Sequence, residues 1–246
     1  MECNILFPVY NERLRLEQGI RRTVAYMDRW MKGRYVLTIV DNASTDETPE
    51  IAGRLCREYA QVKYQRLEEK GVGAAFRAGI RCNEAPIVGY MDVDLSTDLR
   101  HLKQVWNIFQ TNPDVGMVNG SRWNRRSRVY GRKWYRMLTS YGLTVLLKLG
   151  LELRASDAVC GFKFFRRQIA QDLILEAGNH ENGWSYIIEL LLRAERGGIN
   201  IAELPVHWKD DYRSTVHVCQ QIRNYCQQIR RMRKKFKMEE KAAEKK

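Results

Sequence analysis

The chain has 246 residues and a formal net charge of +13, from 42 Lys and Arg against 29 Asp and Glu. This length suits one large domain with a substantial core, and the excess of cations favours anionic partners: nucleotide phosphates, lipid phosphates or nucleic acid. The six cysteines form no Cys-x-x-Cys pair, and we expect free thiols in a reducing compartment, not a disulfide framework or a zinc site. No signal peptide is expected, and no apolar run reaches the roughly 18–20 residues of a membrane-spanning helix.

The first half of the chain alternates between predicted strands and predicted helices. Strands are expected at residues 2–8, 35–40, 62–66, 87–91 and 115–119, and helices at 13–31, 48–59, after Gly73 and from Leu99. Ser44 or Thr45 is expected to cap the helix that begins near Thr48. This alternation predicts an α/β fold built from βαβ units around a mostly parallel sheet, flanked by helices.

The second half is less regular. A basic loop at 120–133 precedes a predicted helix at 134–150, a short strand that ends at Phe165, a helix that starts near Trp184, and an edge strand at 199–208. A final basic helix carries an apolar stripe, formed by Ile222, Tyr225, Ile229, Met232 and Phe236. We expect one domain over residues 1–215 and a basic amphipathic helix and tail over residues 216–246.

Unusual polar residues follow three of the predicted strands, at the point where each strand ends. Tyr10 and Glu12 follow the first strand, Asp41 ends the second, and Asp92 and Asp94 follow the fourth. Because ligands bind beyond the carboxyl ends of parallel strands, these residues predict a site at one edge of the sheet.

Asp92 and Asp94 are the most informative pair. Residues two apart in a strand point to one side, so the two carboxylates can face a common point, where they repel each other unless a cation lies between them. Mg²⁺ or Mn²⁺, hard divalent ions that prefer oxygen ligands and often keep substrate phosphates and water in their shell, fit such a pair. A lone Asp-x-Asp is also common as two solvated loop aspartates, and only the neighbouring loops favour the metal site.

Four motifs in this order and spacing resemble those of the family 2 inverting glycosyltransferases. They are Pro8-Val9-Tyr10-Asn11-Glu12, Asp41-Asn42-Ala43-Ser44-Thr45-Asp46, Lys70-Gly71-Val72-Gly73-Ala74-Ala75 and Asp92-Val93-Asp94. Three later motifs point to the dolichol-phosphate or polyprenyl-phosphate hexose synthase branch: Gly120-Ser121-Arg122-Trp123, Cys160-Gly161-Phe162-Lys163 and Glu203-Leu204-Pro205-Val206-His207-Trp208. The resemblance covers roughly residues 4–216 and implies a GT-A fold, a nucleotide-sugar donor and a divalent metal.

The resemblance implies roles for individual residues on the donor side. Residues expected to bind the nucleotide-sugar are Pro8, Tyr10, Glu12, Asp41, Lys70, Gly73 and Asp92. The metal ligands are expected to be Asp92 and Asp94, with Ser96 at the position of a third ligand. Where relatives usually carry Asp-Asp-Gly-Ser, this chain has Asp41-Asn42-Ala43-Ser44, so the second acid is missing.

On the acceptor side, the resemblance implies that Arg122 and Arg136, with Ser140 nearby, bind the phosphate of the acceptor. Asp157 occupies the place of an acid near the reacting sugar, and with Asp94 it is expected to be catalytic. The residues agree with this view, because no acid occurs between Asp114 and Glu152. An acceptor phosphate is already ionised near neutral pH, so it needs positioning by arginines more than a general base.

The function expected from these features is metal-dependent transfer of a hexose to a polyprenyl or dolichyl phosphate at the cytoplasmic face of a membrane. The donor is expected to be UDP-glucose or a similar UDP-hexose, with GDP-mannose as the alternative. The basic C-terminal helix is expected to bind an anionic membrane surface, and a membrane-protein partner is possible in this scheme. A soluble glycan or protein acceptor is the second reading, and a nucleic-acid-binding protein is the third. The third leaves Asp92 and Asp94 unexplained, and we expect no nucleic-acid partner.

Some residues stay open at this level. Phe162, Phe164 and Phe165 are expected in the core. Glu189 falls on an apolar helix face, where it could pair with an arginine or reach the donor sugar. Trp184, which opens the same helix, is kept as a site candidate.

Overall fold

The structure is a computed structural model that describes residues 1–131, 134–179, 181–210 and 218–243. Within its helices, the side chains of residues 134–136, 138, 218–225 and 243 lie outside this description. The strands are β1 (Cys3–Val9), β2 (Tyr35–Asn42), β3 (Val62–Leu67), β4 (Ile87–Met91), β5 (Val115–Ser121), β6 (Arg128–Tyr130), β7 (Phe162–Arg166), β8 (Asn200–Pro205) and β9 (His207–Lys209). The helices are α1 (Leu16–Met31), α2 (Thr48–Glu58), α3 (Val72–Arg81), α4 (Arg100–Thr111), α5 (Trp134–Leu151), α6 (Arg167–Ala177), α7 (Trp184–Arg196) and α8 (Val218–Ala243).

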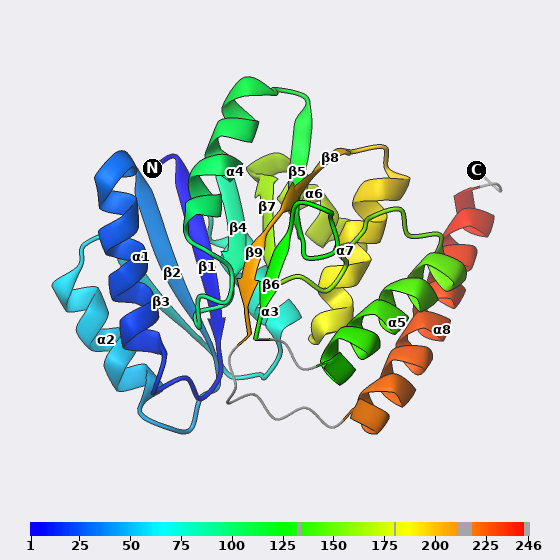
Figure 1. Cartoon of the computed structure of the whole chain (residues 1–246), viewed down its shortest axis with the longest axis horizontal. Coiled ribbons are helices and arrows are strands. Elements are labelled where there is room, and N and C mark those ends of the chain that lie inside the picture. The colour runs from blue at the N-terminus through cyan, green and yellow to red at the C-terminus, as the bar shows by residue number, and fades with distance from the viewer. Residues whose placement is uncertain (132–133, 180, 211–217, 244–246) are drawn as a thin grey trace.

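A central sheet with the strand order β3-β2-β1-β4-β7-β5-β8 runs through the molecule (Figure 1). Its pairs are parallel except where β7 lies between β4 and β5, antiparallel to both. The predicted α/β class and mostly parallel sheet are therefore confirmed. The short β6 and β9 pair in a second, parallel ribbon beside the main sheet.

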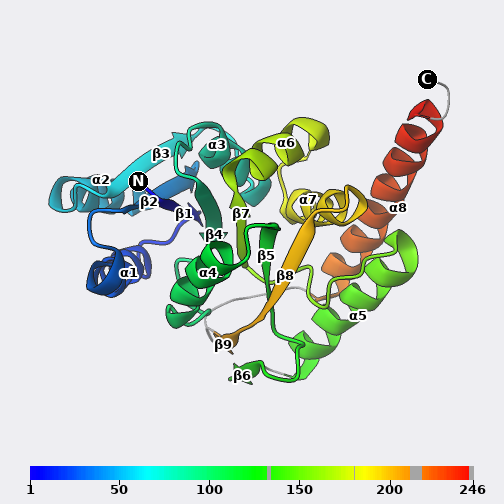
Figure 2. The ribbon, with the colours of Figure 1, turned by 90° about the horizontal axis from the view of Figure 1, so that it is seen from above.

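Helices cover both faces of the sheet, as Figure 2 shows from above. The core on one face is formed with α1, α2 and α4, and the core on the other face with α3, α5, α6, α7 and α8. The apolar residues of α1 keep helical spacing and are buried, as predicted: Leu16, Ile20, Val24, Met27 and Met31. Phe162, Phe164 and Phe165 are also buried in the core, as expected.

The prediction of the α2 cap was wrong. The side chain of Asp46 accepts the hydrogen bond from the Thr48 N–H, whereas the Ser44 hydroxyl accepts one from the backbone of Asn11. Ser44 therefore joins the loop after β2 to the loop after β1.

The second half differs from prediction in three elements. The predicted basic loop contains β6, the helix α6 was not predicted, and the predicted strand over 199–208 is divided into β8 and β9. The division falls beside Pro205, which has no N–H with which to continue a ladder. Strand β8 does lie at the edge of the sheet, as its proline indicated.

Helix α8 packs against α5 and α7 at one end of the molecule (Figures 1 and 2). Three residues of its predicted apolar stripe, Ile229, Met232 and Phe236, pack into the core, and the side chains of Ile222 and Tyr225 lie outside the described part. Among the described residues, none of the helices combines the length and apolarity that crossing a membrane requires.

Candidate active site

Asp92 and Asp94 lie in a tight turn directly after β4. The carbonyl oxygen of Asp92 accepts a hydrogen bond from the Leu95 N–H, and Asp94 Oδ1 accepts one from the Ser96 N–H at 2.9 Å. Leu95 adopts a φ of 55°, a left-handed conformation that is strained for this residue. The turn therefore holds both carboxylates at the carboxyl edge of the sheet, where the sequence predicted them.

The charge around Asp92 favours a cation. Burial raises the pKa of Asp92 to about 8, and the carboxylates of Asp94 and Glu12 add to this effect, against the opposing charges of Arg122 and Lys163. A divalent ion between the two aspartates would relieve this repulsion, so the residues present fit the expected metal.

Further ligands for such an ion must come from outside the acidic groups. The described residues contain no cluster of three or more His, Cys, Asp or Glu side chains that could hold a metal. Ser96 is buried in the same turn, at the position expected for a hydroxyl ligand. Mg²⁺ and Mn²⁺ commonly fill the rest of their shell with phosphate oxygens and water, which suits a diphosphate donor.

Gly161 lies against the carboxylate of Asp92. A Cβ atom at Gly161 would lie 2.1 Å from Asp92 Oδ2 and 2.7 Å from its Cγ, closer than atoms can approach. The motif that contains Gly161 predicts no role for this glycine, because only the structure brings the start of β7 beside the end of β4.

Replacing Gly161 by alanine is expected to displace the Asp92 carboxylate and to weaken Mn²⁺ binding by about tenfold or more, as for other changes next to metal ligands. The free Mn²⁺ signal in electron paramagnetic resonance measures this without any assay of activity. Gly53→Ala is the matched control, because its Cβ would meet only the far end of Arg57 at 3.7 Å. Equal Mn²⁺ affinity in both variants would contradict the role of Gly161.

The pKa of Asp92 also predicts a pH-dependent stability. The pKa of Asp92 is about 8 in the folded protein and close to its ordinary value in the unfolded chain. Between these two pH values, the unfolded chain carries the ionised carboxylate and the folded protein the protonated one. The free energy of unfolding therefore falls as the pH rises towards 8. In the presence of a chelator, Asp92→Asn is therefore expected to melt at a higher temperature than the unsubstituted chain at pH 8.5, and at the same temperature near pH 3.5. A lower melting temperature for the variant at pH 8.5 would show that the ionised Asp92 carboxylate does not destabilise the folded protein.

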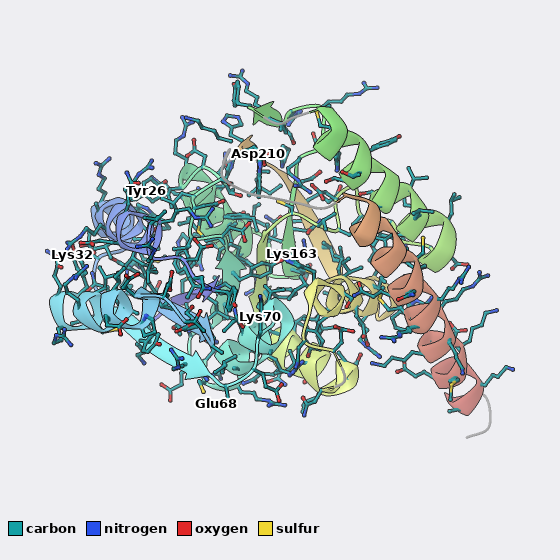
Figure 3. The ribbon with its side chains drawn as sticks, turned by 90° about the horizontal axis from the view of Figure 1, so that it is seen from below. Tyr26, Lys32, Glu68, Lys70, Lys163 and Asp210 are labelled. Atoms are coloured by element: carbon teal, nitrogen blue, oxygen red, sulfur yellow. The ribbon has the colours of Figure 1, made fainter. Side chains whose placement is uncertain are left out.

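The loop after β1 contributes an aromatic ring and a carboxylate. The Lys70 ammonium lies over the ring of Tyr10, with Nζ 3.6 Å from the ring centroid. Glu12 accepts two hydrogen bonds from the Arg15 guanidinium at 2.6 and 2.7 Å. The structure thus brings three predicted donor-site residues to the edge where Asp92 lies, and Figure 3 looks onto this edge with Lys70 near its middle.

Asp41 is less accessible than its expected role suggests. Its side chain is fully buried, and its oxygens accept hydrogen bonds from the Ser44 N–H, the Tyr64 hydroxyl and Arg66. Arg66 and Tyr64 on β3 were not predicted as partners. Asn42, the second residue of the Asp41 motif, is buried and donates to the Val9 carbonyl, so it joins β2 to β1.

Gly73 contacts another loop of the protein. Its N–H donates to the Asn182 carbonyl at 2.8 Å, and a Cβ would collide with Tyr186 on α7. Pro8, within β1, is half-buried. Trp184, the first residue of α7, is exposed beside the Gly73 contact, so it stays a site candidate.

Arg122 and Asp157, predicted for different roles, bind each other. The guanidinium donates from Nε to Asp157 Oδ2 at 2.7 Å and from Nη2 to Oδ1 at 3.0 Å, and the backbone N–H of Arg122 also donates to Oδ2. Only 5% of the Arg122 side chain and none of Asp157 is exposed. Burial would raise the pKa of Asp157, but the charge and hydrogen bonds of Arg122 outweigh it and hold the pKa below its ordinary value.

Lys163 is a buried cation that sequence reasoning left without a role. It lies on β7 between Tyr90 of β4 and Asn119 of β5, and its Nζ donates to the Cys160 carbonyl at 2.8 Å (Figure 3). Burial lowers its pKa, and its charge acts on both Asp92 and Asp157. In the sequence, a lysine between two phenylalanines of a predicted buried strand is the feature that could have indicated a buried cation.

Two acceptor-side residues lie on α5. The side chain of Arg136 is outside the described residues, so its predicted role is not addressed. Ser140 is half-buried, and its carbonyl accepts a hydrogen bond from Thr144 within the helix.

Glu189, for which two roles were open, pairs with cations in the structure. It accepts hydrogen bonds from Arg193 at 2.9 Å and from Lys235 of α8 at 2.7 Å, and its side chain is 6% exposed. Glu189 therefore joins α7 to α8, and of its two open roles the structure shows the pairing with an arginine.

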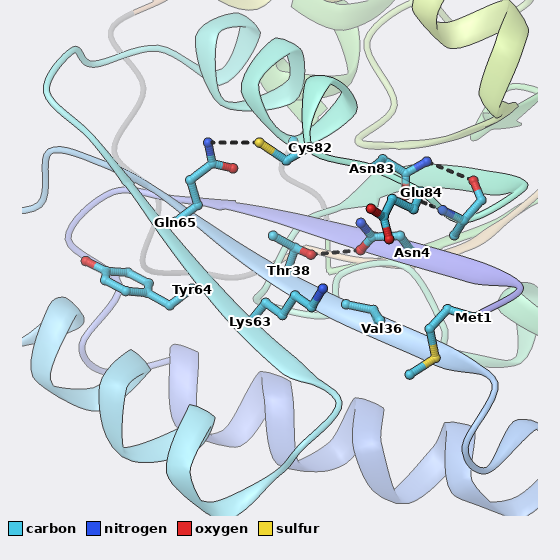
Figure 4. A pocket seen from close by; sticks show the side chains of 12 residues that line it. Met1, Asn4, Val36, Thr38, Lys63, Tyr64, Gln65, Cys82, Asn83 and Glu84 are labelled. Carbon is cyan, nitrogen blue, oxygen red and sulfur yellow. Dashed lines mark hydrogen bonds between the residues drawn. The ribbon is translucent and has the colours of Figure 1, made fainter.

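A pocket of about 350 Å³ lies away from this edge, between α3 and strands β1 to β3 (Figure 4). Two of its polar residues satisfy each other, since the Thr38 hydroxyl donates to Asn4 at 2.9 Å. None of the predicted site residues lines it.

This arrangement, a mostly parallel sheet with paired aspartates after its central strand, is that of a nucleotide-sugar-dependent transferase fold, and comparisons agree. Residues 4–174 match the family described as "Glycosyl transferase family 2", so the chain belongs to that family. It is 30% identical over 233 residues to "Glycosyltransferase AglD" of Haloferax volcanii, which covers 94% of this chain but 37% of that protein.

Further relatives are named "Dolichyl-phosphate beta-glucosyltransferase". The one from Homo sapiens is 28% identical over 221 residues, which cover 85% of this chain and 68% of that protein. The one from Saccharomyces cerevisiae is 24% identical over 224 residues, which cover 84% of this chain and 66% of that protein. A crystal structure of glucosyl-3-phosphoglycerate synthase from Mycobacterium tuberculosis, in complex with Mn²⁺, UDP and phosphoglyceric acid, has a TM-score of 0.67 at 16% identity, covering 93% of this chain and 76% of that one. This likeness confirms the expected GT-A fold.

Proposed function

We propose that this chain transfers a hexose from a nucleotide-sugar to a polyprenyl or dolichyl phosphate. The observation that carries the proposal is the Asp92 and Asp94 pair, which lies beside Glu12 at the carboxyl edge of the sheet in a family 2 chain. The names of the relatives support a dolichyl-phosphate acceptor and a glucosyl group, although the chain spans only about a third of the first of them and about two thirds of the others. The UDP and Mn²⁺ bound to the fold neighbour support a UDP-sugar and a divalent ion.

In the proposed reaction, an oxygen of the acceptor phosphate attacks the anomeric carbon of the sugar while the bond from that carbon to the diphosphate breaks. Asp92, Asp94 and Ser96 would hold Mg²⁺ or Mn²⁺, which stabilises the charge of the departing diphosphate when bound. The phosphate acceptor is already ionised near neutral pH, so the protein has to position it, not to remove a proton.

The donor side is assigned to Pro8, Tyr10, Glu12, Asp41, Lys70 and Gly73, as the motifs indicated. The Lys70 ammonium covers one face of the Tyr10 ring, so a base would stack on the other face, and the ammonium lies close enough to the donor site to pair with the diphosphate.

The acceptor side is assigned to Arg136 and Ser140 at the start of α5. Arg122 and Asp157 are assigned a positioning role, because each satisfies the other inside the protein. Their pair fixes the loop after β5, from which the chain continues to α5.

Transfer assays with a panel of radiolabelled nucleotide-sugars, Mn²⁺ and a membrane lipid extract test the proposal. We expect UDP-glucose to label a product that extracts into organic solvent and is stable to mild alkali but not to mild acid. Labelling of a water-soluble glycan or of protein in the same extract would instead support a soluble acceptor. The cytoplasmic membrane face and a membrane-protein partner stay predictions of the sequence, as do both alternative readings.

A further inference from the structure

Lys163 is a cation without a counter-ion inside the protein. Its side chain is fully buried, and its Nζ donates a hydrogen bond to the Cys160 carbonyl at 2.8 Å. Among the residues that the structure describes, no aspartate or glutamate forms an ion pair with it. An ammonium has three N–H donors, so its burial beside a single acceptor costs free energy that an apolar residue would not cost. The proposed reaction assigns this charge no task.

The two neighbours of Lys163 in the sheet are also polar. Tyr90 of β4 and Asn119 of β5 are its partners in the strand register, and both are fully buried. In the described part of the chain, neither the Tyr90 hydroxyl nor the Asn119 side-chain oxygen has a hydrogen-bond partner. Three neighbouring strands thus place polar groups on a face whose core is formed mostly by apolar residues. Departures of this kind from an apolar core are typical of functional sites.

Asp92 lies diagonally across from Lys163. Strands β4 and β7 are antiparallel, with Tyr90 opposite Lys163. Asp92, two residues after Tyr90, therefore comes opposite Gly161. Residues that are diagonal in this way point to the same face of a sheet, with their Cα atoms about 7–8 Å apart. The Asp92 carboxylate occupies the space of a side chain at position 161, since a Cβ there would lie 2.1 Å from Oδ2. No side chain of residue 161 therefore separates the lysine from the aspartate.

The other acids near Lys163 are already paired. Glu12 and Asp157 each accept two hydrogen bonds from an arginine guanidinium. Asp92 and Asp94 have no such partner among the described residues. The charge of Lys163 favours the ionised form of Asp92, which is the form that would hold a divalent ion. Lys163 is thus a fixed positive charge beside the place expected for the metal.

We propose that Lys163 is a positioning residue whose buried charge weakens the binding of a divalent ion to Asp92 and Asp94 and stabilises the departing diphosphate. A fixed cation repels an incoming Mg²⁺ or Mn²⁺. It attracts the diphosphate, which gains negative charge when its bond to the anomeric carbon breaks and the electron pair of that bond stays on the diphosphate oxygen. Because the cation is held in place and away from water, this effect needs no reorganisation. The effect on the diphosphate rests on the proposed function, whereas the effect on the ion concerns the metal site alone.

A purely structural role of Lys163 makes the opposite prediction. The hydrogen bond to Cys160 fixes the segment that ends at Gly161, against which Asp92 lies. If Lys163 only held this segment, its loss would loosen Asp92 and weaken metal binding, as expected for Gly161→Ala. If its charge repels the ion, its loss strengthens metal binding.

The Mn²⁺ affinity of the full chain, measured by the free-ion signal in electron paramagnetic resonance, tests the proposal without an assay of activity. Lys163→Met removes the charge and keeps most of the apolar volume, and it should bind Mn²⁺ about tenfold or more tightly. A proton on Asp92 also competes better in this variant, but a divalent ion carries twice its charge, so the gain for Mn²⁺ is larger. Lys163→Gln, which keeps an N–H donor, should change the affinity in the same direction.

Two further variants are controls for side-chain size and for the net charge of the chain. Lys163→Arg keeps the charge and should bind Mn²⁺ as the unsubstituted chain does. Lys63→Met makes the same replacement at an exposed position of β3 and should leave the affinity unchanged. Unchanged or weaker Mn²⁺ binding by both Lys163→Met and Lys163→Gln would overturn the proposal. An arginine variant that binds Mn²⁺ as tightly as the methionine variant would also overturn it. Circular dichroism verifies that each variant is folded.

Turnover measures the effect on the diphosphate. At saturating Mn²⁺, Lys163→Met should lower the kcat of hexosyl transfer by about tenfold or more and change the KM for the donor less, because the charge is stabilised as the bond breaks. An unchanged kcat would contradict this part of the proposal. If the variants bind Mn²⁺ more tightly but the unsubstituted chain uses no donor of the panel, the proposed function fails and the effect of Lys163 on the metal site stands.

Discussion

Replacing Asp92 or Asp94 by asparagine is expected to lower hexosyl transfer by roughly 100–1,000-fold, as the loss of a group that stabilises developing charge does in other enzymes. The fold should survive, because an amide keeps the shape of the carboxylate and can still accept the Ser96 hydrogen bond at position 94. At position 92, it also removes a strained charge. Radiolabel transfer from the best donor of the panel, with thermal melting beside it, measures both effects.

Asp98→Asn is the control for this prediction. Asp98 lies on the same loop, accepts hydrogen bonds from Arg100, and has no assigned role in the site. Its variant should transfer sugar at nearly the unsubstituted rate. Position 92 or 94 variants that keep that rate in the presence of a chelator would end the metal hypothesis.

Arg122→Ala and Asp157→Ala are expected to destabilise the fold by about 3–5 kcal/mol each, because either change leaves an unpaired charge inside the protein. The double variant Arg122→Met/Asp157→Leu should recover much of this loss, since it removes both charges and keeps apolar volume. Urea unfolding monitored by circular dichroism measures the three free energies of unfolding.

Arg100→Ala provides the comparison, because its ion pair with Asp98 is exposed and should contribute less than about 1 kcal/mol. If Arg122→Ala were as stable as Arg100→Ala and raised only the KM for the lipid phosphate, Arg122 would be an acceptor ligand and not a positioning residue.

Much of the fold follows from patterns that are local in the chain. The spacing of Leu16, Ile20, Val24, Met27 and Met31 defines a helix face, and the short apolar runs before Asp41 and Asp92 define buried strands. Parallel strands end at one edge, so the positions of Tyr10, Glu12, Asp41, Asp92 and Asp94 in the site followed without any knowledge of distance.

The unpredicted features depend on contacts between distant residues. Arg122 and Asp157 are 35 residues apart, and nothing in their local sequence indicates that they form a buried pair. Lys70, just before α3, contacts Tyr10, just after β1, because the fold places these two loops side by side. The direction of β7 is likewise invisible in the pattern of Phe162–Arg166, because an apolar run predicts a strand but not its neighbours.

The amphipathic pattern of α8 was interpreted correctly as two-sided, but the sequence alone does not say what covers the apolar side. In the structure, α5 and α7 cover the described part of that side.

The reversed direction of β7 changes which parts of the chain can shape the site. In an all-parallel sheet, only segments that follow strands reach the binding edge, but here Phe162 at the start of β7 pairs with Met91 at the end of β4. The segment 152–161, which precedes β7, therefore enters the site from the opposite chain direction and brings Asp157, Cys160 and Gly161 with it. Substitutions in that segment are therefore expected to change the site, whereas the β7–α6 junction lies at the opposite edge of the sheet, where Arg166 donates to the carbonyls of Phe109 and Val115.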